Sequence, residues 1–244
     1  MVGCYYFFLL KKSLSLLFTV QVGALLYKVM KYAWSEETGY ALRRDLQRPI
    51  PPVPASIPLT RRPFQRGDAR HFAAPPGLWR RITRTRIDQV SRTEFINADI
   101  SLATVLVAPD GAPCFIAWQI ASSEGGKAAF YRKAHHLPLS DDEVLLEGAF
   151  VPEQYRRKKI MACGNWHSAE VARALGGRWA VCYVEARNVA SLRGFLAADF
   201  HPYLLTKVVW RVFRRVVSVV SLSEEETLRL ETSWRQHSGK STPV

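Results

Sequence analysis

The clearest pattern of apolar and polar positions predicts a strand that runs straight into a helix. The apolar run 144–151 stops at Pro152, as a buried strand does. Four cations at 156–159 follow this proline, and a helical stretch continues to Gly176. The free N–H groups at a helix start, together with the helix dipole, favour an anionic ligand at this turn.

The downstream pattern predicts two further strands and two further helices. Residues 179–185 predict a strand, and residues 188–200 predict a short helix with its closing turn. Residues 208–220 are rich in β-branched side chains and predict one long strand. A capping-box signature at 223–226 opens a final helix from Glu224 to about Gln236, followed by a loose tail.

The upstream half predicts the remaining strands of the same domain. An Asp110-Gly111 pair between two apolar runs is a hairpin signal. The strands expected here are 57–63, 101–107 and 114–120, with helical stretches around 68–72 and 78–93 and an insertion without clear period at 127–140.

The N-terminus is strongly apolar and basic. Its two apolar runs, 1–10 and 13–27, are broken by Lys11-Lys12, and each is shorter than the ~20 residues of a spanning helix. Joining them into one spanning helix would place two lysines within the bilayer, and inserting each lysine would cost roughly 2.5–3.5 kcal/mol. We therefore expect residues 1–31 to contact the inner face of a membrane as a surface helix. A single membrane span and packing on the folded domain remain alternatives.

Proline density divides the chain. Five prolines between residues 48 and 58 predict an extended spacer. The expected organisation is a hydrophobic and basic helical segment at 1–46, a proline-rich linker at 47–58, a folded domain at 59–222, and a C-terminal helix and tail at 223–244.

Composition narrows the class of partner. The 244 residues are 48% hydrophobic and carry a net charge of +13, which predicts a globular domain with an anionic partner, unless the charge serves only solubility. Nucleic acid ranks last among such partners, because the cations occur along the whole chain without an aromatic-basic motif. The four cysteines lack zinc spacing, so no metal is expected, and Cys114 and Cys182 are expected to be buried, reduced thiols of a cytoplasmic protein.

Two segments resemble the GNAT superfamily of acyltransferases (GCN5-related N-acetyltransferases). The segment 150–161, Phe-Val-Pro-Glu-Gln-Tyr-Arg-Arg-Lys-Lys-Ile-Met, is similar to the family's apolar strand followed by Pro-x-x-Tyr-Arg-Gly-x-Gly-x-Gly/Ala. The segment 188–200 is similar to Asn-x-x-Ala-x-x-Leu-Tyr-x-x-x-Gly-Phe. The resemblance is clear over 143–203 and thinner over 59–119. It implies an α+β fold with a mixed, mostly antiparallel central sheet flanked by helices, to which this chain adds an N-terminal hydrophobic helix.

The resemblance also implies a reaction and a site. The donor would be acetyl-CoA, another acyl-CoA or an acyl-carrier-protein thioester, and an amine would attack it directly. Glu147 is expected to be the general base, as a carboxylate on this strand is in some relatives, unless it points outward or pairs with an arginine. Asn188 is expected at least to cap its helix. The donor-binding residues expected on this basis are Phe150, Val151, Arg156, Arg157, Lys158, Lys159, Ile160, Met161, Asn188 and Phe195.

The chain departs from the family pattern where the chemistry is expected. Arg157, Lys159 and Met161 replace glycines that let the backbone approach the pyrophosphate of coenzyme A. Helical backbone does not require glycine, so we expect a helix start whose cations either bind phosphates or are merely solvated. Phe195 replaces a tyrosine that can protonate the leaving thiolate, and Asp199 replaces the glycine of the closing turn. A catalytically degenerate, membrane-associated binding module is the alternative function.

Overall fold

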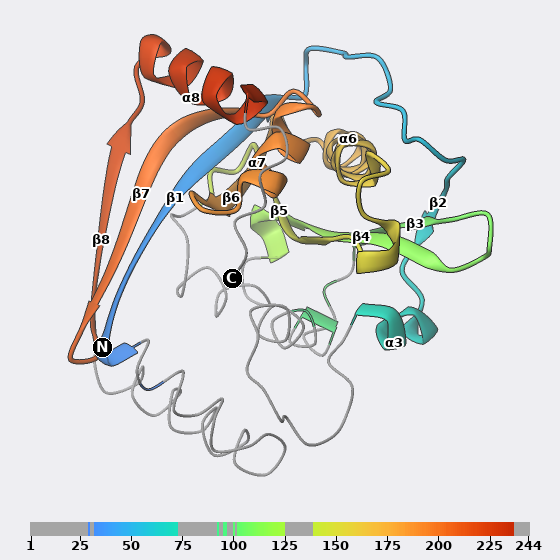
Figure 1. The fold of residues 1–244 in the computed structure, drawn as a ribbon, viewed down its shortest axis with the longest axis horizontal. Coiled ribbons are helices and arrows are strands. Elements are labelled where there is room, and N and C mark those ends of the chain that lie inside the picture. Colours follow the sequence, from blue (N-terminus) through green and yellow to red (C-terminus); the bar gives the residue numbers. More distant parts are fainter. Residues whose placement is uncertain are drawn as a thin grey trace.

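An eight-stranded sheet forms the centre of the protein. The computed structural model describes residues 29, 32–72, 92, 95–96, 100, 102–124 and 139–236. The strand order is β2-β3-β4-β5-β6-β1-β7-β8, and helices α6, α7 and α8 lie on one side of this sheet (Figure 1). The elements are β1 (Trp34–Asp45), β2 (Thr60–Pro63), η1 (Arg66–Asp68), α3 (Ala69–Phe72), β3 (Ala103–Val107), β4 (Pro113–Ala121), η2 (Ser122–Glu124), β5 (Glu143–Phe150), η3 (Glu153–Tyr155), α6 (Ile160–Ala174), β6 (Trp179–Glu185), α7 (Val189–Leu196), β7 (His201–Arg211), β8 (Arg214–Ser221) and α8 (Glu224–Gln236).

The central strands β5 and β6 are parallel, and they pair only over a short distance. Residues 143–145 of β5 pair with residues 179–181 of β6, whereas β5 continues to Phe150 and β6 to Glu185. The other neighbouring strands are antiparallel. The expected α+β fold with a mixed, mostly antiparallel sheet is therefore confirmed.

A β-bulge bends β5 just beyond this pairing. The register between β4 and β5 shifts between Ile116 and Trp118, and Gly148 stands opposite this shift with a φ of 66°. A Cβ atom at Gly148 would lie 2.8 Å from the Trp118 ring, so both the backbone conformation and the close contact require glycine. The bulge therefore lies in the part of β5 that no longer pairs with β6.

Buried side chains fill both faces of the sheet. One core cluster lies between the sheet and α6, α7 and α8, and includes Leu42, Leu146 and Trp234. A second cluster, with Trp118 and Val181, lies on the opposite face. Cys114 and Cys182 are buried and free, as expected, and burial raises the pKa of the Cys114 thiol to about 11.

The expectation of an N-terminal helix reaching Leu46 is wrong for residues 34–45, which form β1. This strand pairs antiparallel with β6 on one edge and β7 on the other, and Leu42 and Leu46 are buried in the core. A Cβ atom at Gly39 would lie 3.0 Å from the Val184 carbonyl oxygen, so glycine permits the close approach of β6. Pairing on both edges overrides the helical propensity of the charged sequence. The expected helix of residues 1–28 lies outside the described residues.

The proline-rich segment 47–58 crosses the domain instead of separating two units. The Trp166 indole N–H of α6 donates to the Ile50 carbonyl (3.4 Å), and the Ser56 N–H donates to the Lys158 carbonyl (2.9 Å). Because β1 already belongs to the sheet, this segment leads from β1 across α6 to β2. The first strand of the expected domain begins at Thr60.

The expected long strand at 208–220 is two strands joined by a tight turn. Val212 and Phe213 form the turn between β7 and β8, and both have positive φ (46° and 61°). Neither is glycine, asparagine or aspartate, so the usual turn signal is missing from the sequence.

Other expected elements are confirmed where the structure describes them. Strands β3 and β4 are joined at the Asp110-Gly111 turn, where the Gly111 N–H donates to the Ala108 carbonyl (2.9 Å). The capping box of α8 forms, because the N–H of Ser223 donates to the Glu226 carboxylate (2.8 Å). The expected elements at 78–91 and 127–138, and the tail from residue 237, lie outside the described residues.

A buried ion pair fastens β1 to α6. Arg44 is only 1% exposed, and its guanidinium donates to the Glu170 carboxylate at 2.9 Å. Arg173, which is exposed, binds the other oxygen of the same carboxylate. The free-energy cost of desolvating the Arg44 guanidinium is thus offset chiefly by the Glu170 carboxylate of α6.

Replacing Glu170 with alanine should lower the free energy of unfolding by about 3 kcal/mol, because Arg44 would remain buried without its counter-charge. Arg173→Ala is the matched control, since it removes the exposed partner and should cost less than about 1 kcal/mol. Urea denaturation of the three proteins measures both values. Equal losses in the two variants would contradict a buried role for Arg44.

Candidate functional site

The cationic turn, residues 156–159, lies between the end of β5 and the start of α6. The short helix η3 carries the chain from Pro152 to this turn. Arg156 folds back, so that its Nε donates to the Val151 carbonyl at 3.4 Å. The first cation of the turn therefore lies against the end of the strand that diverges from β6.

Two residues of the cationic turn have left-handed backbone. Arg157 has a φ of 64° and Lys159 a φ of 57°, so the expectation of helical backbone is wrong at these positions. The helix begins at Ile160, with Lys159 as an N-cap whose side chain makes no capping hydrogen bond. Left-handed backbone suits glycine and costs other residues roughly 1–2 kcal/mol. The turn thus has a glycine-like conformation at two positions where the family pattern has glycine, yet it carries long cationic side chains.

A tyrosine and an aspartate hold the cationic turn in place. The Tyr155 hydroxyl donates to the carboxylate of Asp110, in the turn between β3 and β4. This hydrogen bond raises the pKa of Tyr155 to about 12 and lowers the pKa of Asp110. Lys158 Nζ lies 5.3 Å from the centre of the Tyr155 ring. The sequence alone does not indicate this contact, because Tyr155 belongs to the motif after β5, whereas Asp110 belongs to a turn 45 residues earlier.

The first residues of α6 pack inside the protein. Ile160 is buried in a third core cluster with Phe115 and Val151. A Cβ atom at Gly194 of α7 would lie 2.5 Å from Met161 Cγ, so Met161 fills the contact between the two helices. These two expected donor-binding residues therefore contact the core and α7.

Glu147 and Phe150 occupy the strand beyond the divergence. Glu147 is half-buried opposite Trp118 of β4. Burial raises the pKa of the Cys182 thiol on β6, and the charge of Glu147 contributes to this shift. The Phe150 ring packs edge-on against Phe72, and the Arg92 guanidinium lies 3.7 Å from its centre. The side chain of Phe150 is thus part of the core on the α3 side.

The two expected residues of α7 have different surroundings. Asn188 caps the helix, as expected, because its Oδ1 accepts the Ser191 N–H at 3.3 Å. Phe195 is buried and packs edge-on against Phe200 at 5.2 Å between ring centres. Asp199, at the glycine position of the closing turn, has a φ of 65°. The structure thus gathers Val151, Arg156 and the rest of the cationic turn at one end of β5, and it places Phe195 within the core.

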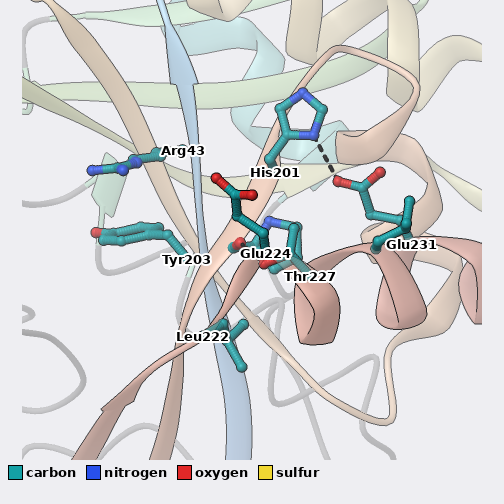
Figure 2. Close-up of a pocket in the computed structure, with 9 residues that line it drawn as sticks. Arg43, His201, Tyr203, Leu222, Glu224, Thr227 and Glu231 are labelled. Carbon is teal, nitrogen blue, oxygen red and sulfur yellow. Dashed lines mark hydrogen bonds and ion pairs between the residues drawn. The ribbon is translucent and has the colours of Figure 1, made fainter.

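A separate pocket of about 380 Å³ lies beside α8 (Figure 2). Its lining comes from β1, from β7, from α8 and from the link between β8 and α8, and includes Arg43, Tyr203 and Glu224. The Arg43 guanidinium lies 4.7 Å from the Tyr203 ring centre and 4.5 Å from that of Trp179. None of the lining residues belongs to β5, β6 or α6, so this pocket is distinct from the divergence.

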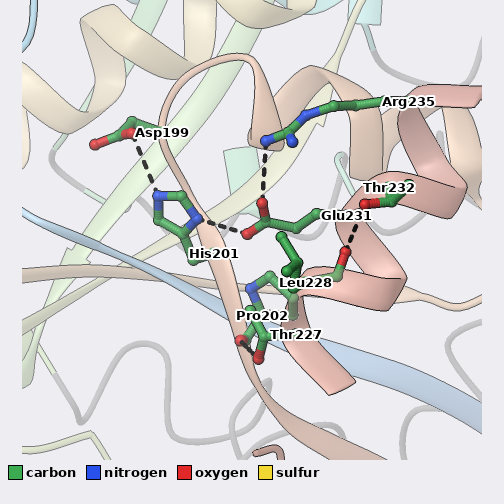
Figure 3. Close-up of polar contacts among 8 residues, drawn as sticks. All are labelled: Asp199, His201, Pro202, Thr227, Leu228, Glu231, Thr232 and Arg235. Carbon is green, nitrogen blue, oxygen red and sulfur yellow. Dashed lines mark hydrogen bonds and ion pairs between the residues drawn. The ribbon is translucent and has the colours of Figure 1, made fainter. Parts of the chain in front are cut away.

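The polar groups beside this pocket bind one another (Figure 3). One ring nitrogen of His201 lies 2.6 Å from the Glu231 carboxylate and the other 3.3 Å from Asp199. Arg235 donates to the second oxygen of Glu231 at 3.0 Å. The Thr227 hydroxyl donates to the carbonyl of Pro202. These contacts fasten α8 to the start of β7.

The sheet with its short central parallel pair, followed by the cationic turn and helix α6, has the mixed α+β arrangement that the resemblance in the sequence implies. Among solved structures the chain is similar to a GCN5-related N-acetyltransferase from Sphaerobacter thermophilus (15% identity, TM-score 0.45, 79% of this chain and 59% of that chain). It is also similar to a GNAT-family acetyltransferase from Colwellia psychrerythraea (12% identity, TM-score 0.46, 81% of this chain and 62% of that chain). A third similar structure is a tandem GNAT protein from the clavulanic acid biosynthesis pathway (13% identity, TM-score 0.47, 83% of this chain and 60% of that chain). The chain thus spans about three fifths of the length of each of these structures. No protein-family model and no curated protein matches the sequence.

Replacing Lys159 with glycine should leave the melting temperature unchanged or raise it, because glycine adopts a φ of 57° without strain. The expected gain is up to about 1 kcal/mol. Lys158→Gly is the matched control: Lys158 is not left-handed, so the added chain entropy should lower stability. Thermal denaturation compares the two. A larger loss for Lys159→Gly than for Lys158→Gly would contradict the left-handed assignment.

Proposed function

We propose that this protein transfers an acetyl or longer acyl group from a thioester of coenzyme A, or of an acyl-carrier protein, to an amine. The observation that supports this most strongly is the divergence of β5 and β6 next to the cationic turn. A thioester carried on a long phosphorylated arm has a polar carbonyl at one end and anionic groups further along. The diverging strands would accommodate the carbonyl, and the cationic turn would bind the anionic groups.

In this proposal the phosphates lie at the cationic turn and the start of α6. Arg156, Arg157, Lys158 and Lys159 supply positive charge, and the helix start adds main-chain N–H groups and the helix dipole. Because Arg157 and Lys159 carry side chains where glycine would leave bare backbone, binding through guanidinium and ammonium groups is the expected mode. The net charge of +13 would also steer an acidic carrier protein.

The acyl group would then lie between the strands, with its carbonyl at the main chain of Phe150 and Val151. The amine nitrogen attacks the carbonyl carbon, the carbon–sulfur bond breaks, and Glu147 accepts the proton of the amine. Phe195 has no proton to give, so the leaving thiolate takes one from water. Positioning of the amine against the thioester supplies most of the acceleration in such a site.

We also propose that residues 1–31 contact the inner face of a membrane, as their sequence indicates. Among the residues that the structure describes, no helix is both long enough and apolar enough to cross a bilayer. Long-chain donors, or acceptors made at the membrane, would suit such an arrangement.

A catalytically degenerate binding module is the second candidate. Two observations favour it: Phe195 packs in the core beside Phe200, and the cationic turn carries long side chains at glycine positions. Such a module would bind the thioester or its phosphates without turnover.

Adding acyl-CoA should raise the melting temperature, and Arg156→Ala should abolish most of this shift by removing a cation at the strand end. At a ligand concentration one hundred times Kd, the stabilisation is about 2.7 kcal/mol. Arg229→Ala, an exposed arginine of α8, is the matched control and should keep the full shift. A thermal-shift series from acetyl-CoA to long-chain acyl-CoA also identifies the donor. No shift with any thioester, including those of the carrier protein, would refute both candidates.

Thiol release in the presence of a panel of amines distinguishes the two candidates. For an enzyme, Glu147→Gln should lower kcat about 10²–10⁴-fold while the donor-induced thermal shift remains. Glu153→Gln, an exposed glutamate near the same turn, is the control and should leave kcat unchanged. Thermal shift without thiol release from the unaltered protein would instead establish the binding module.

A further inference from the structure

The turn between β7 and β8 presents apolar side chains to solvent. Strands β1, β7 and β8 run together past the helices to this turn (Figure 1). Val212 is 72% exposed and Phe213 is 38% exposed. Trp34, at the start of β1, pairs with Arg211 and is 69% exposed. Three large apolar side chains therefore share one end of the sheet.

The backbone of this turn disfavours the residues that form it. Both central residues have positive φ, the conformation of type I′ hairpin turns, in which asparagine and glycine are preferred. A β-branched residue such as Val212 is an outlier in this conformation. Turn geometry and solubility both favour small polar residues here. The presence of Val212 and Phe213 therefore indicates that they serve a function other than stabilising the fold.

The N-terminal segment enters the domain at the same turn. The N–H of Val212 donates to the Ala33 carbonyl (2.7 Å), and the N–H of Phe213 donates to the Tyr32 carbonyl (2.9 Å). The residues that precede this point, 1–31, have the apolar and lysine-containing sequence that predicts membrane contact. The described chain thus meets the exposed turn at Tyr32 and Ala33, directly after this segment in the sequence.

Positive charge surrounds the turn. The sequence 208–222 contains Arg211, Arg214 and Arg215 and no acidic residue. The Arg211 guanidinium lies 4.0 Å from the Trp34 ring centre. The nearby carboxylate of Glu36 binds Lys207 at 2.7 Å and lies 3.8 Å from Arg211, whereas Arg214 is exposed at the turn. Apolar side chains next to guanidinium groups suit the membrane interface, where the apolar groups contact acyl chains and the guanidinium groups contact lipid phosphates.

We propose that the hairpin tip, defined as Trp34, Arg211, Val212, Phe213 and Arg214, docks on an anionic lipid bilayer. Val212, Phe213 and Trp34 enter the interface, and the arginines bind lipid phosphates. A net charge of +13 opposes association with a second copy and favours an anionic surface. This proposal does not depend on acyl transfer.

Sedimentation of the full chain with phosphatidylcholine vesicles, with and without phosphatidylserine, tests the proposal. The double variant Val212→Asn, Phe213→Gly supplies the preferred type I′ pair, so it should fold at least as well while losing the apolar tip. We expect its partition into anionic vesicles to fall about tenfold or more. Leu228→Asn, which removes an exposed leucine on α8, is the matched control and should partition like the unaltered protein.

A second measurement reports on the tip itself. Brominated lipids should quench a component of tryptophan fluorescence that is lost in Trp34→Phe, because Trp34 lies at the interface. Absence of this component, or partition of the double variant within about twofold of the unaltered protein, overturns the proposal. Conversion of a dimer to a monomer by the double variant in buffer without vesicles would also overturn it, because a second copy would then cover the tip.

Discussion

The parallel hydrogen bonding between β5 and β6 ends at Leu145 and Val181, and the rest of the sheet is arranged around this short pairing. Beyond this point, within the described part of the chain, each of the two strands is paired only on its opposite edge. Strand β5 pairs with β4 through the bulge at Gly148, and β6 pairs with β1. Strand β1 therefore supports the far side of the divergence, and its buried ion pair to α6 holds it in place.

The cationic turn shows that tertiary contacts can impose a backbone conformation on residues that disfavour it. Arg157 and Lys159 are left-handed on either side of one fixed point and after another: the Lys158 carbonyl accepts the Ser56 N–H, and Tyr155 is bound to Asp110. The strain of roughly 1–2 kcal/mol per residue is small beside the packing of α6. The consequence is chemical, because a phosphate at this turn would meet flexible cationic side chains and its binding would weaken with salt.

Sequence reasoning succeeded where the information was local. The strand, turn and helix of 144–174, the hairpin at Asp110 and the capping box of α8 each depend on a few adjacent residues. It failed for β1, whose partners on β6 and β7 are more than a hundred residues away. It missed the turn at Val212 because no turn-forming residue marks it, and it missed the Tyr155–Asp110 contact because 45 residues separate the pair.

The position of β1 also fixes the distance between the hairpin tip and the candidate site. Tyr40 of β1 pairs with Val184, beside the divergence, and Trp34 at the tip lies six residues earlier. At about 3.3 Å per residue, the two positions are roughly 20 Å apart along one strand. Residues 34–40 pair with β7 throughout, and from Gly39 onward also with β6, so this part of β1 is stiffer than a linker and a bilayer bound at the tip would stay at that distance. Under the two proposals, a lipid-anchored acceptor would have to project about 20 Å along β1 to reach the level of the divergence, whereas a thioester on coenzyme A or a carrier protein would enter from solution.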